Sequence, residues 1–492
     1  MYDEQQWILK RAQLTPHKKA LIEIETSRTW TYSQLAKEIN KWQQILCKHR
    51  IQVGDRVCVI SENNIDTFAI LFACGMTGAI FVPINWRLSE TEIQYIMNDC
   101  QPTLCIYEDS FKTIVDNVTF SHKWSFTNQL NECKEHVHYN CSWNASTPWF
   151  IIYTGGTTGN PKGAVLTFDS VNWNAINTVL SWNLCSEDCT INYMPLFHTG
   201  GLNALAMPIL MAGGTVVIGK KFNAEQAIRA INDYQSTISL FVPTMYQEIV
   251  QTDYFKHADF PTVNVFLSGG APCPQPIYEH FHKRGLLFKE GYGLTEAGPN
   301  NFYIDPVEAM KKPGAIGKNM QFNQIRIVNE DGSLCDKYEV GELQLKGKHL
   351  FKEYWNNERE TKAVFCEEWF KTGDLAKMDD QYDVSIVGRK KEMIISGGEN
   401  IYPQEIEQCI STHPNVKEVA VVGVDDFYWG EVVTAFIVCN EEAGMFEEQI
   451  RAFCVQQLAN YKVPKKFVLL NELPKTTVGK IDKKKLTQYV SS

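Results

Sequence analysis

The chain has 492 residues, about three times the length of a typical single domain, so we expect more than one domain. Hydrophobic residues make up 44% and charged residues 21%, a balance that excludes collagen-like, coiled-coil and wholly disordered proteins. The formal net charge is -10, whereas nucleic-acid binders carry an excess of positive charge, so we expect no nucleic-acid partner. Residues 451–492, however, contain nine Lys or Arg and two acids, so an anionic ligand is expected to meet this segment.

The fifteen cysteines are odd in number, dispersed, and often flanked by apolar residues, which favours reduced thiols over disulfides. A metal-like pattern occurs at Cys133, His136, His138 and Cys141. No second ligand pair accompanies it, so a polar connecting loop is the favoured interpretation.

No targeting or membrane-spanning segment is evident. The N-terminal MYDEQQWILKRAQ contains acidic residues and lacks an apolar core, so we expect a cytoplasmic protein. Residues 68–84 are the most apolar run, but they are too short for a span and contain two glycines and a proline. We expect a helix, a turn and a buried strand there. Peripheral contact with a membrane is the one kind of membrane interaction that the sequence still allows.

Helical and strand patterns alternate through the first half of the chain. Thr31 and Gln34 form a capping-box pattern before an amphipathic helix. A turn followed by a short apolar strand then occurs at residues 54–60 and recurs at 103–107, 214–219 and 236–243. This alternation predicts an α/β fold with mainly parallel sheets covered by helices.

The pattern changes after residue 322. Two short apolar runs flank a turn at Glu330, Asp331 and Gly332, which predicts a hairpin in a β-rich subdomain. From residue 401 onward, helix, strand, strand and helix follow within about 60 residues. We therefore predict a large portion at 1–388, a connection at 389–391 and a small α+β domain at 392–492.

The strongest chemical signal is a Gly/Thr-rich loop that follows a short apolar run. Its glycines and threonines let backbone N–H groups and hydroxyls converge on an anion, and Lys162 adds a mobile positive charge. The spacing fits neither the Walker A nor the GxGxxG pattern. A phosphate-binding loop is favoured over a plain surface turn, with candidate residues Thr154, Gly155, Gly156, Thr157, Thr158, Gly159 and Lys162.

A second signal is the segment GYGLTE at residues 291–296. Tyr292 can stack on a purine, the Thr295 hydroxyl can bond a phosphate, and a carboxylate such as Glu296 beside phosphates is a usual magnesium ligand. On its own this segment also fits a turn that ends a strand.

Together with five further segments, these loops resemble the acyl-CoA synthetases of the ANL superfamily of adenylate-forming enzymes. The resemblance covers essentially the whole chain, in an order and spacing that chance does not produce. The seven segments are YTGGTTGNPKG (153–163), MPLFHTGG (194–201), LSGGAP (267–272), GYGLTE (291–296), WFKTGD (369–374), GRKKEMIISGGENIYPQEIE (388–407) and PKTTVGKI (474–481).

The resemblance implies a two-step reaction. A small-molecule carboxylic acid attacks the α-phosphate of ATP, giving acyl-AMP and pyrophosphate, and coenzyme A then displaces AMP. ATP, Mg²⁺ and coenzyme A are thus the expected cofactors, in a monomer or homodimer. Lys480 would bridge the two anions during adenylation, although a solvated surface lysine is the alternative at this position.

The resemblance also assigns the other candidate residues. The Gly/Thr loop would hold the β- and γ-phosphates, Thr295 would lie near the α-phosphate, and Thr158 and Glu296 would serve the metal. Asp374 would accept both ribose hydroxyls with help from Arg389. The adenine slot would be formed by Gly270, Ala271, Pro272, Tyr292 and Gly293.

Domain movement is a further implication. The family rotates its small domain about a hinge that corresponds to Lys391, after which Gly397 and Gly398 would let the pantetheine arm of coenzyme A pass. An ordinary turn is the alternative for this glycine pair. His198 would shield the acyl site. The alternative is that His198 is a core histidine whose hydrogen bonds are made within the protein.

Position 155 departs from the family pattern, and the identity of the acid substrate is left open by the motifs. The family usually has Ser where Gly155 stands, so we expect a slower rather than an inactive enzyme. Likeness in segments such as 82–89 and 350–355 favours a medium- or long-chain fatty acid as substrate. An aryl acid such as a benzoate or o-succinylbenzoate, a carrier-protein ligase, a luciferase-like oxygenase and a non-catalytic acyl- or nucleotide-binding protein are the alternatives.

Overall fold

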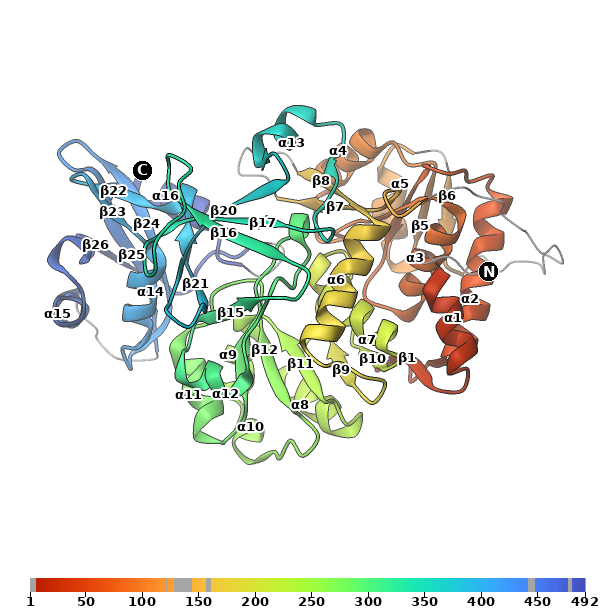
Figure 1. Ribbon diagram of the computed structural model, residues 1–492, viewed down its shortest axis with the longest axis horizontal. Helices are drawn as coiled ribbons and strands as arrows, with labels where there is room; N and C mark the ends of the chain where they lie inside the picture. Colours follow the sequence, from red (N-terminus) through yellow and green to blue (C-terminus); the bar gives the residue numbers. More distant parts are fainter. Residues whose placement is uncertain are drawn as a thin grey trace.

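The computed structural model describes residues 6–120, 122–127, 144–155, 161–440, 447–476 and 480–491 (Figure 1). Strands in these residues assemble into five sheets. The first sheet has the order β18-β8-β7-β4-β3-β5-β6. Its strands are β3 (Arg56–Ile60), β4 (Ile80–Pro83), β5 (Leu104–Tyr107), β6 (Lys123–Ser125), β7 (Pro148–Thr154), β8 (Lys162–Thr167) and β18 (Glu353–Tyr354). Strands β3 to β7 pair in parallel, and their short apolar runs are buried because both faces of the sheet are covered.

The second and third sheets adjoin one another. The second has the order β2-β1-β10-β9 and the third the order β11-β12-β13, with every pairing parallel except β1 with β2. Thr237 N donates to Cys189 O at 2.8 Å where the two sheets meet. The strands are β1 (Lys19–Glu23), β2 (Thr29–Thr31), β9 (Cys189–Asn192), β10 (Thr215–Ile218), β11 (Ile238–Phe241), β12 (Val265–Ser268) and β13 (Phe288–Glu290).

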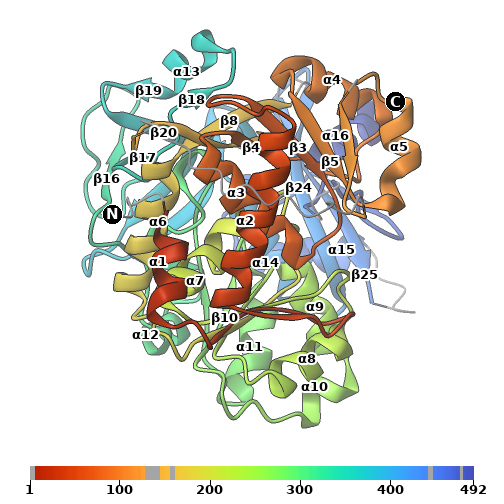
Figure 2. The same cartoon turned by 90° about the vertical axis from the view of Figure 1, so that its right-hand side faces the viewer.

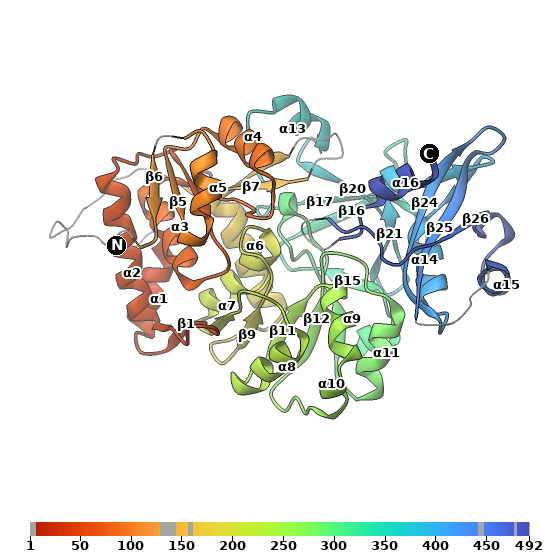
Figure 3. The same cartoon turned by 180° about the vertical axis from the view of Figure 1, so that it is seen from behind.

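The fourth sheet is antiparallel and lies between the N-terminal sheets and the C-terminal unit in Figures 1 and 3. Its order is β14-β15-β21-β20-β17-β16, and β19 also pairs with β20. The strands are β14 (Phe302–Tyr303), β15 (Ala315–Asn319), β16 (Gln324–Val328), β17 (Gly341–Lys346), β19 (Phe365–Cys366), β20 (Trp369–Met378) and β21 (Val384–Arg389).

The C-terminal unit has its own sheet and core. The strand order is β23-β22-β25-β24, with β26 paired to β25. Val421 packs in one apolar cluster, whereas Ala420 and Val422 pack in another, as the alternation of a strand covered on both faces requires. The strands are β22 (Ile394–Ser396), β23 (Glu399–Ile401), β24 (Val416–Asp426), β25 (Gly430–Cys439) and β26 (Lys466–Leu469).

Helices cover these sheets, and Figure 2 shows α2 across the outer side of the large portion. The helices are α1 (Trp7–Leu14), α2 (Tyr32–Lys48), α3 (Ile65–Thr77), α4 (Glu90–Cys100), α5 (Lys112–Asn117), α6 (Phe168–Ser181), α7 (Ala206–Ala212), α8 (Ala224–Asp233), α9 (Pro243–Gln251), α10 (Asp253–His257), α11 (Gln275–Lys283), α12 (Pro306–Lys311), α13 (Glu358–Val364), α14 (Pro403–Ser411), α15 (Glu447–Gln457) and α16 (Lys483–Ser491). The short turns are η2 (Asp109–Phe111), η3 (Gly200–Ala204), η4 (Thr295–Ala297), η5 (Lys390–Glu392) and η6 (Asn460–Lys462).

The predicted α/β fold class is confirmed. Thr31 and Gln34 form the expected capping box of α2, and residues 68–84 contain most of α3, a left-handed Gly78 and strand β4. Among the described residues, no helix is both long enough and apolar enough to cross a membrane, and the cysteines are free thiols. The Cys/His pattern at 133–141 lies outside the described residues.

The expected hairpin differs in length. Strands β16 and β17 pair in antiparallel fashion, and Asn329 N donates to Ser333 O across the predicted turn. Strand β17, however, begins only at Gly341, because the chain after the turn first makes an isolated bridge between Val328 and Leu334.

Candidate active site

The Gly/Thr-rich loop connects two paired strands. β7 and β8 are antiparallel, with Thr154 opposite Lys162, so these two strands form a hairpin. Gly156, Thr157, Thr158 and Gly159 lie outside the described residues. Gly155 is exposed, and a Cβ atom added there would meet no atom of the described residues within 4 Å.

Lys162 is held at the start of β8 by residues that are distant in sequence. Its Nζ lies 2.5 Å from Glu360 Oε2 on α13 and 5.5 Å from the centre of the Tyr354 ring. The Glu360 carboxylate has a lowered pKa because it accepts a hydrogen bond from Lys162. The lysine is therefore positioned as a cation beside the loop.

Tyr354 also contacts the second predicted motif. Its hydroxyl donates to Glu296 Oε1 at 2.8 Å, and Phe351 N donates to the Glu296 carbonyl at 2.7 Å. Thr295 is buried beside Glu296 in η4. Tyr354 thus contacts both Lys162 and Glu296. The sequence did not predict this role, although Tyr354 lies in residues 350–355, one of the segments that resemble the family.

The predicted adenine slot is assembled by two neighbouring strands. Gly270, Ala271 and Pro272 follow β12, and Tyr292 follows β13, so the carboxyl ends of parallel strands bring them together. Gly291 N donates to Ser268 O at 2.8 Å, which ties the two segments.

Glycine is required at Gly293 by close backbone packing. A Cβ atom there would lie 2.2 Å from the carbonyl carbon of Pro299 and 2.3 Å from the oxygen of Gly298. Both contacts are backbone atoms, so no side chain can move aside. The chain therefore turns sharply beside Tyr292.

Asp374 is a buried carboxylate with two partners. Its Oδ1 lies 2.6 Å from Arg389 Nε, and its Oδ2 accepts a hydrogen bond from the Tyr292 hydroxyl at 2.5 Å. The strand register places Asp374 on β20 opposite Arg389 on β21. Burial raises the pKa of Asp374 against the opposing effects of Arg389 and Tyr292. Two acceptor oxygens in this position suit a ligand with neighbouring hydroxyl groups.

Lys480 comes from the C-terminal unit yet faces the large portion. Its pKa is lowered by burial and by Arg389, while Asp374 and Glu296 oppose this shift. The residue also keeps solvent access. The structure therefore brings Lys480 together with Arg389, Asp374 and Glu296.

His198 lies within electrostatic reach of Lys480. Burial and the charge of Lys480 lower the pKa of His198 to about 4, so the imidazole is neutral at pH 7. Its Nδ1 accepts a hydrogen bond from Gly200 N at 3.1 Å, which sets the orientation of the ring at the start of η3.

The residues present fit a metal ion that is held mainly by the phosphates of a bound nucleotide and only in part by the protein. Among the described residues, no three His, Cys, Asp or Glu side chains gather as a metal site. Glu296 supplies a single carboxylate beside Lys162 and Thr295. One carboxylate together with substrate phosphates is the usual way in which proteins hold Mg²⁺.

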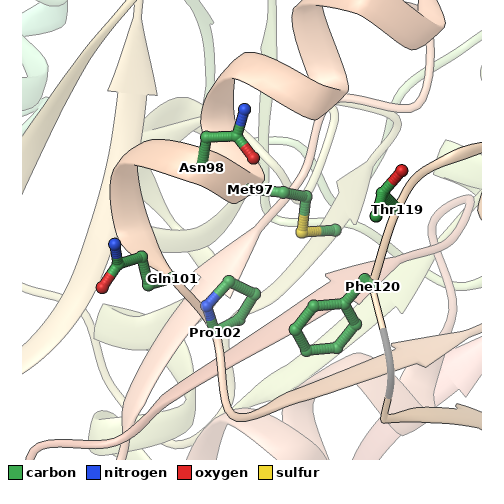
Figure 4. Close-up of a pocket in the computed structure, with 6 residues that line it drawn as sticks. All are labelled: Met97, Asn98, Gln101, Pro102, Thr119 and Phe120. Carbon is green, nitrogen blue, oxygen red and sulfur yellow. The ribbon is translucent and has the colours of Figure 1, made fainter.

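Two predicted features remain, the Gly397–Gly398 pair and Lys391. Gly397 and Gly398, with φ of +61° and +88°, form the two-residue turn between β22 and β23, and Gly397 N donates to Trp429 O. Lys391 lies on η5, where its charge acts on Glu360. A cavity of about 400 Å³ beside Met97 and Phe120 contains none of the predicted residues (Figure 4).

Comparison with known proteins identifies the family. The chain matches the family "AMP-binding enzyme" over residues 8–355 and "AMP-binding enzyme C-terminal domain" over residues 405–480. It is 35% identical to an indoleacetate–CoA ligase of Aromatoleum aromaticum, covering 99% of this chain and 98% of that protein. A feruloyl-CoA synthase of an Amycolatopsis species is 32% identical, with 96% of each chain covered. A long-chain-fatty-acid–CoA ligase of Mycobacterium tuberculosis is 31% identical, with 99% and 98% covered.

Solved structures agree with this match. The o-succinylbenzoate CoA synthetase of Bacillus subtilis in complex with its acyl-adenylate intermediate is 30% identical, with a TM-score of 0.89 and 98% and 97% of the two chains covered. The same enzyme in complex with ATP and magnesium ion is 30% identical, with a TM-score of 0.87 and 97% and 98% covered. The chain therefore belongs to the AMP-binding enzyme family, as an AMP-forming acyl-CoA synthetase of the ANL superfamily that uses ATP, Mg²⁺ and coenzyme A.

Proposed function

We propose that this structure is the adenylate-forming arrangement of a two-domain enzyme. Residues 1–388 would bind ATP and the acid, residues 389–391 would form the hinge, and residues 392–492 would be the mobile domain. The observation that carries the proposal is the position of Lys480, a residue of the C-terminal unit that lies within electrostatic reach of Asp374, Glu296 and His198 in the large portion.

Each part of ATP would meet a different group in this site. Lys162 and Thr154 would hold the β- and γ-phosphates, together with Gly155 and the loop residues 156–159. Asp374 would accept the ribose hydroxyls, and Tyr292 would pack on the adenine against residues 270–272. A magnesium ion, when bound through Glu296 and Thr158, would neutralise charge on the phosphate oxygens.

Lys480 would supply the charge that adenylation needs. The acid and the α-phosphate are both anionic, and an ammonium between them lowers their repulsion as the new bond forms. Thr295 would bond the α-phosphate from its buried position in η4. Neutral His198 would shield the acyl group without adding a second cation.

A second arrangement would serve thioester formation. Rotation about Lys391 would withdraw Lys480 and bring the Gly397–Gly398 turn toward the large portion. Both glycines have positive φ and are exposed, so the turn presents backbone rather than side chains. That surface suits close passage of the pantetheine arm of coenzyme A.

For the acid, we propose an aromatic or arylalkyl compound rather than the long-chain fatty acid favoured by overall likeness. α6 and η3, the short helix that follows His198, each contribute a buried asparagine. Asn174 and Asn203 are 1% and 2% exposed, and Asn174 Nδ2 donates to Asn203 O at 2.8 Å. A long alkyl tail gains about 0.8 kcal/mol per methylene only where it is buried against apolar groups. Relatives named for indoleacetate and ferulate support the same preference.

The same asparagines favour an acid that carries a hydrogen-bond donor. The Oδ1 atoms of Asn174 and Asn203 are buried without a hydrogen-bond partner in the described part of the chain. A buried acceptor without a partner costs about 1–3 kcal/mol, which a donor on the substrate would recover.

A panel of acids tests this substrate proposal. We expect indoleacetate or a hydroxycinnamate to be activated with kcat/KM at least about tenfold above 1-naphthaleneacetate, which lacks the donor. Product mass is measured with and without coenzyme A. Efficient turnover of octanoate or palmitate without turnover of any aromatic acid would restore the fatty-acid preference.

Gly155→Ser is expected to raise kcat/KM for ATP about three- to tenfold, because an added hydroxyl can bond a charged phosphate. The site has room for the side chain, and Gly155 is not in the left-handed region. Initial rates of ATP–pyrophosphate exchange measure the effect. Gly155→Ala is the control and should match the wild type, since it adds bulk without a hydroxyl. A Ser variant slower than the Ala variant would contradict the prediction.

A further inference from the structure

The loop that carries Lys480 is closed by its own backbone. An isolated bridge joins Lys475 to Ile481, and Thr476 N donates to Lys480 O at 2.7 Å. Lys480 N in turn donates to Thr476 Oγ1 at 3.2 Å. The backbone at Lys480 is therefore held by hydrogen bonds within the loop, whereas its side chain is exposed.

Three carboxylates attract the Lys480 ammonium. Asp374 and Glu296 belong to the large portion and lie in the nucleotide site, whereas Glu392 belongs to η5, directly after the hinge. The first two draw the ammonium toward the reacting groups. Glu392 lies against Lys483, which follows Lys480 by three residues, so an unneutralised Glu392 would compete with the site for Lys480.

Lys483 forms an ion pair with Glu392. It is the first residue of α16, and its Nζ lies 3.0 Å from Glu392 Oε2 and 2.8 Å from Glu407 Oε1. Its side chain is 24% exposed, so this contact is partly shielded from water. Glu407 has a second partner, because it accepts a hydrogen bond from Val421 N at 2.8 Å.

We propose that Lys483 is a positioning residue for adenylation, which neutralises Glu392 and so keeps this carboxylate from capturing the catalytic Lys480. The inference rests on the proposed role of Lys480. It also explains why a second cation follows so closely on the first. The effect is confined to the adenylation half-reaction, because thioester formation does not use Lys480.

The test separates the two half-reactions in full-length variants. Lys483→Met is expected to slow acid-dependent ATP–pyrophosphate exchange at least tenfold, while turnover of supplied acyl-AMP with coenzyme A changes less than twofold. Adding Glu392→Gln to Lys483→Met is expected to recover most of the lost exchange activity, because the competing carboxylate is gone. Lys483→Arg should behave like the wild type.

Control variants make each outcome decisive. Lys485→Met alters an exposed lysine of the same helix, paired with Asp482 at 4.0 Å, and should keep both half-reactions. Exchange by Lys483→Met at the wild-type rate, or an equally slow double variant, would overturn the inference. Lys480→Ala is measured in parallel: if it keeps its exchange activity, the proposed function itself fails, whereas its loss of exchange assigns any failure to the role of Lys483 alone.

Discussion

Lys480→Ala is expected to slow acid-dependent ATP–pyrophosphate exchange by roughly 10²–10³-fold, because the two reacting anions lose the charge between them. Turnover of supplied acyl-AMP with coenzyme A should persist, since AMP displacement needs no bridge between a carboxylate and a phosphate. Both rates are measured on the same preparation, with exchange followed from labelled pyrophosphate and thioester followed by mass.

Stability distinguishes this loss from misfolding. Burial and Arg389 lower the pKa of Lys480, so below that pKa its charged form costs free energy in the folded state. Removal of the charge should therefore leave the Tm at pH 7 unchanged or slightly raised. Lys485→Ala serves as a matched surface control. Equal loss of both half-reactions, or a lowered Tm, would contradict the role assigned to Lys480.

Asp374→Asn is expected to raise the KM for ATP by roughly 100-fold, because two hydrogen bonds to a charged acceptor are weakened. The same change should not lower the Tm of the ligand-free protein at pH 7. The pKa of Asp374 is raised above its ordinary value of 3.8, so the ionised carboxylate costs folding free energy above the raised pKa, and that cost disappears as the pH falls below 3.8. Steady-state kinetics and thermal unfolding together check the prediction.

Asp383→Asn is the matched control for Asp374. Asp383 is 6% exposed and pairs with Lys312 at 2.5 Å and with Lys318 at 3.3 Å, close to β20 and β21 but away from the nucleotide groups. Its replacement should lower the Tm while leaving the KM for ATP unchanged. If Asp374→Asn lowers the Tm as Asp383→Asn does, and the KM stays constant, Asp374 is a structural ion-pair partner.

Local patterns predicted much of the fold. The capping box at Thr31, the turn at Gly78 and the short apolar strands depend on interactions within a few residues, and the structure contains each of them. The length of the β16–β17 connection was not predictable, because the Val328–Leu334 bridge and the later start at Gly341 depend on the packing of the whole sheet.

The sequence by itself determined the family, because seven motifs of distinctive composition occur in order along the chain. Only the tertiary structure placed Tyr354 between Lys162 and Glu296, and Glu360 against Lys162, since these contacts join residues nearly 60 to 200 positions apart. It also decided that Lys480 of the C-terminal unit lies within electrostatic reach of Asp374 in the large portion. The physical reason is that a motif determines which groups are available, whereas long-range pairing of strands and charges determines which of them meet.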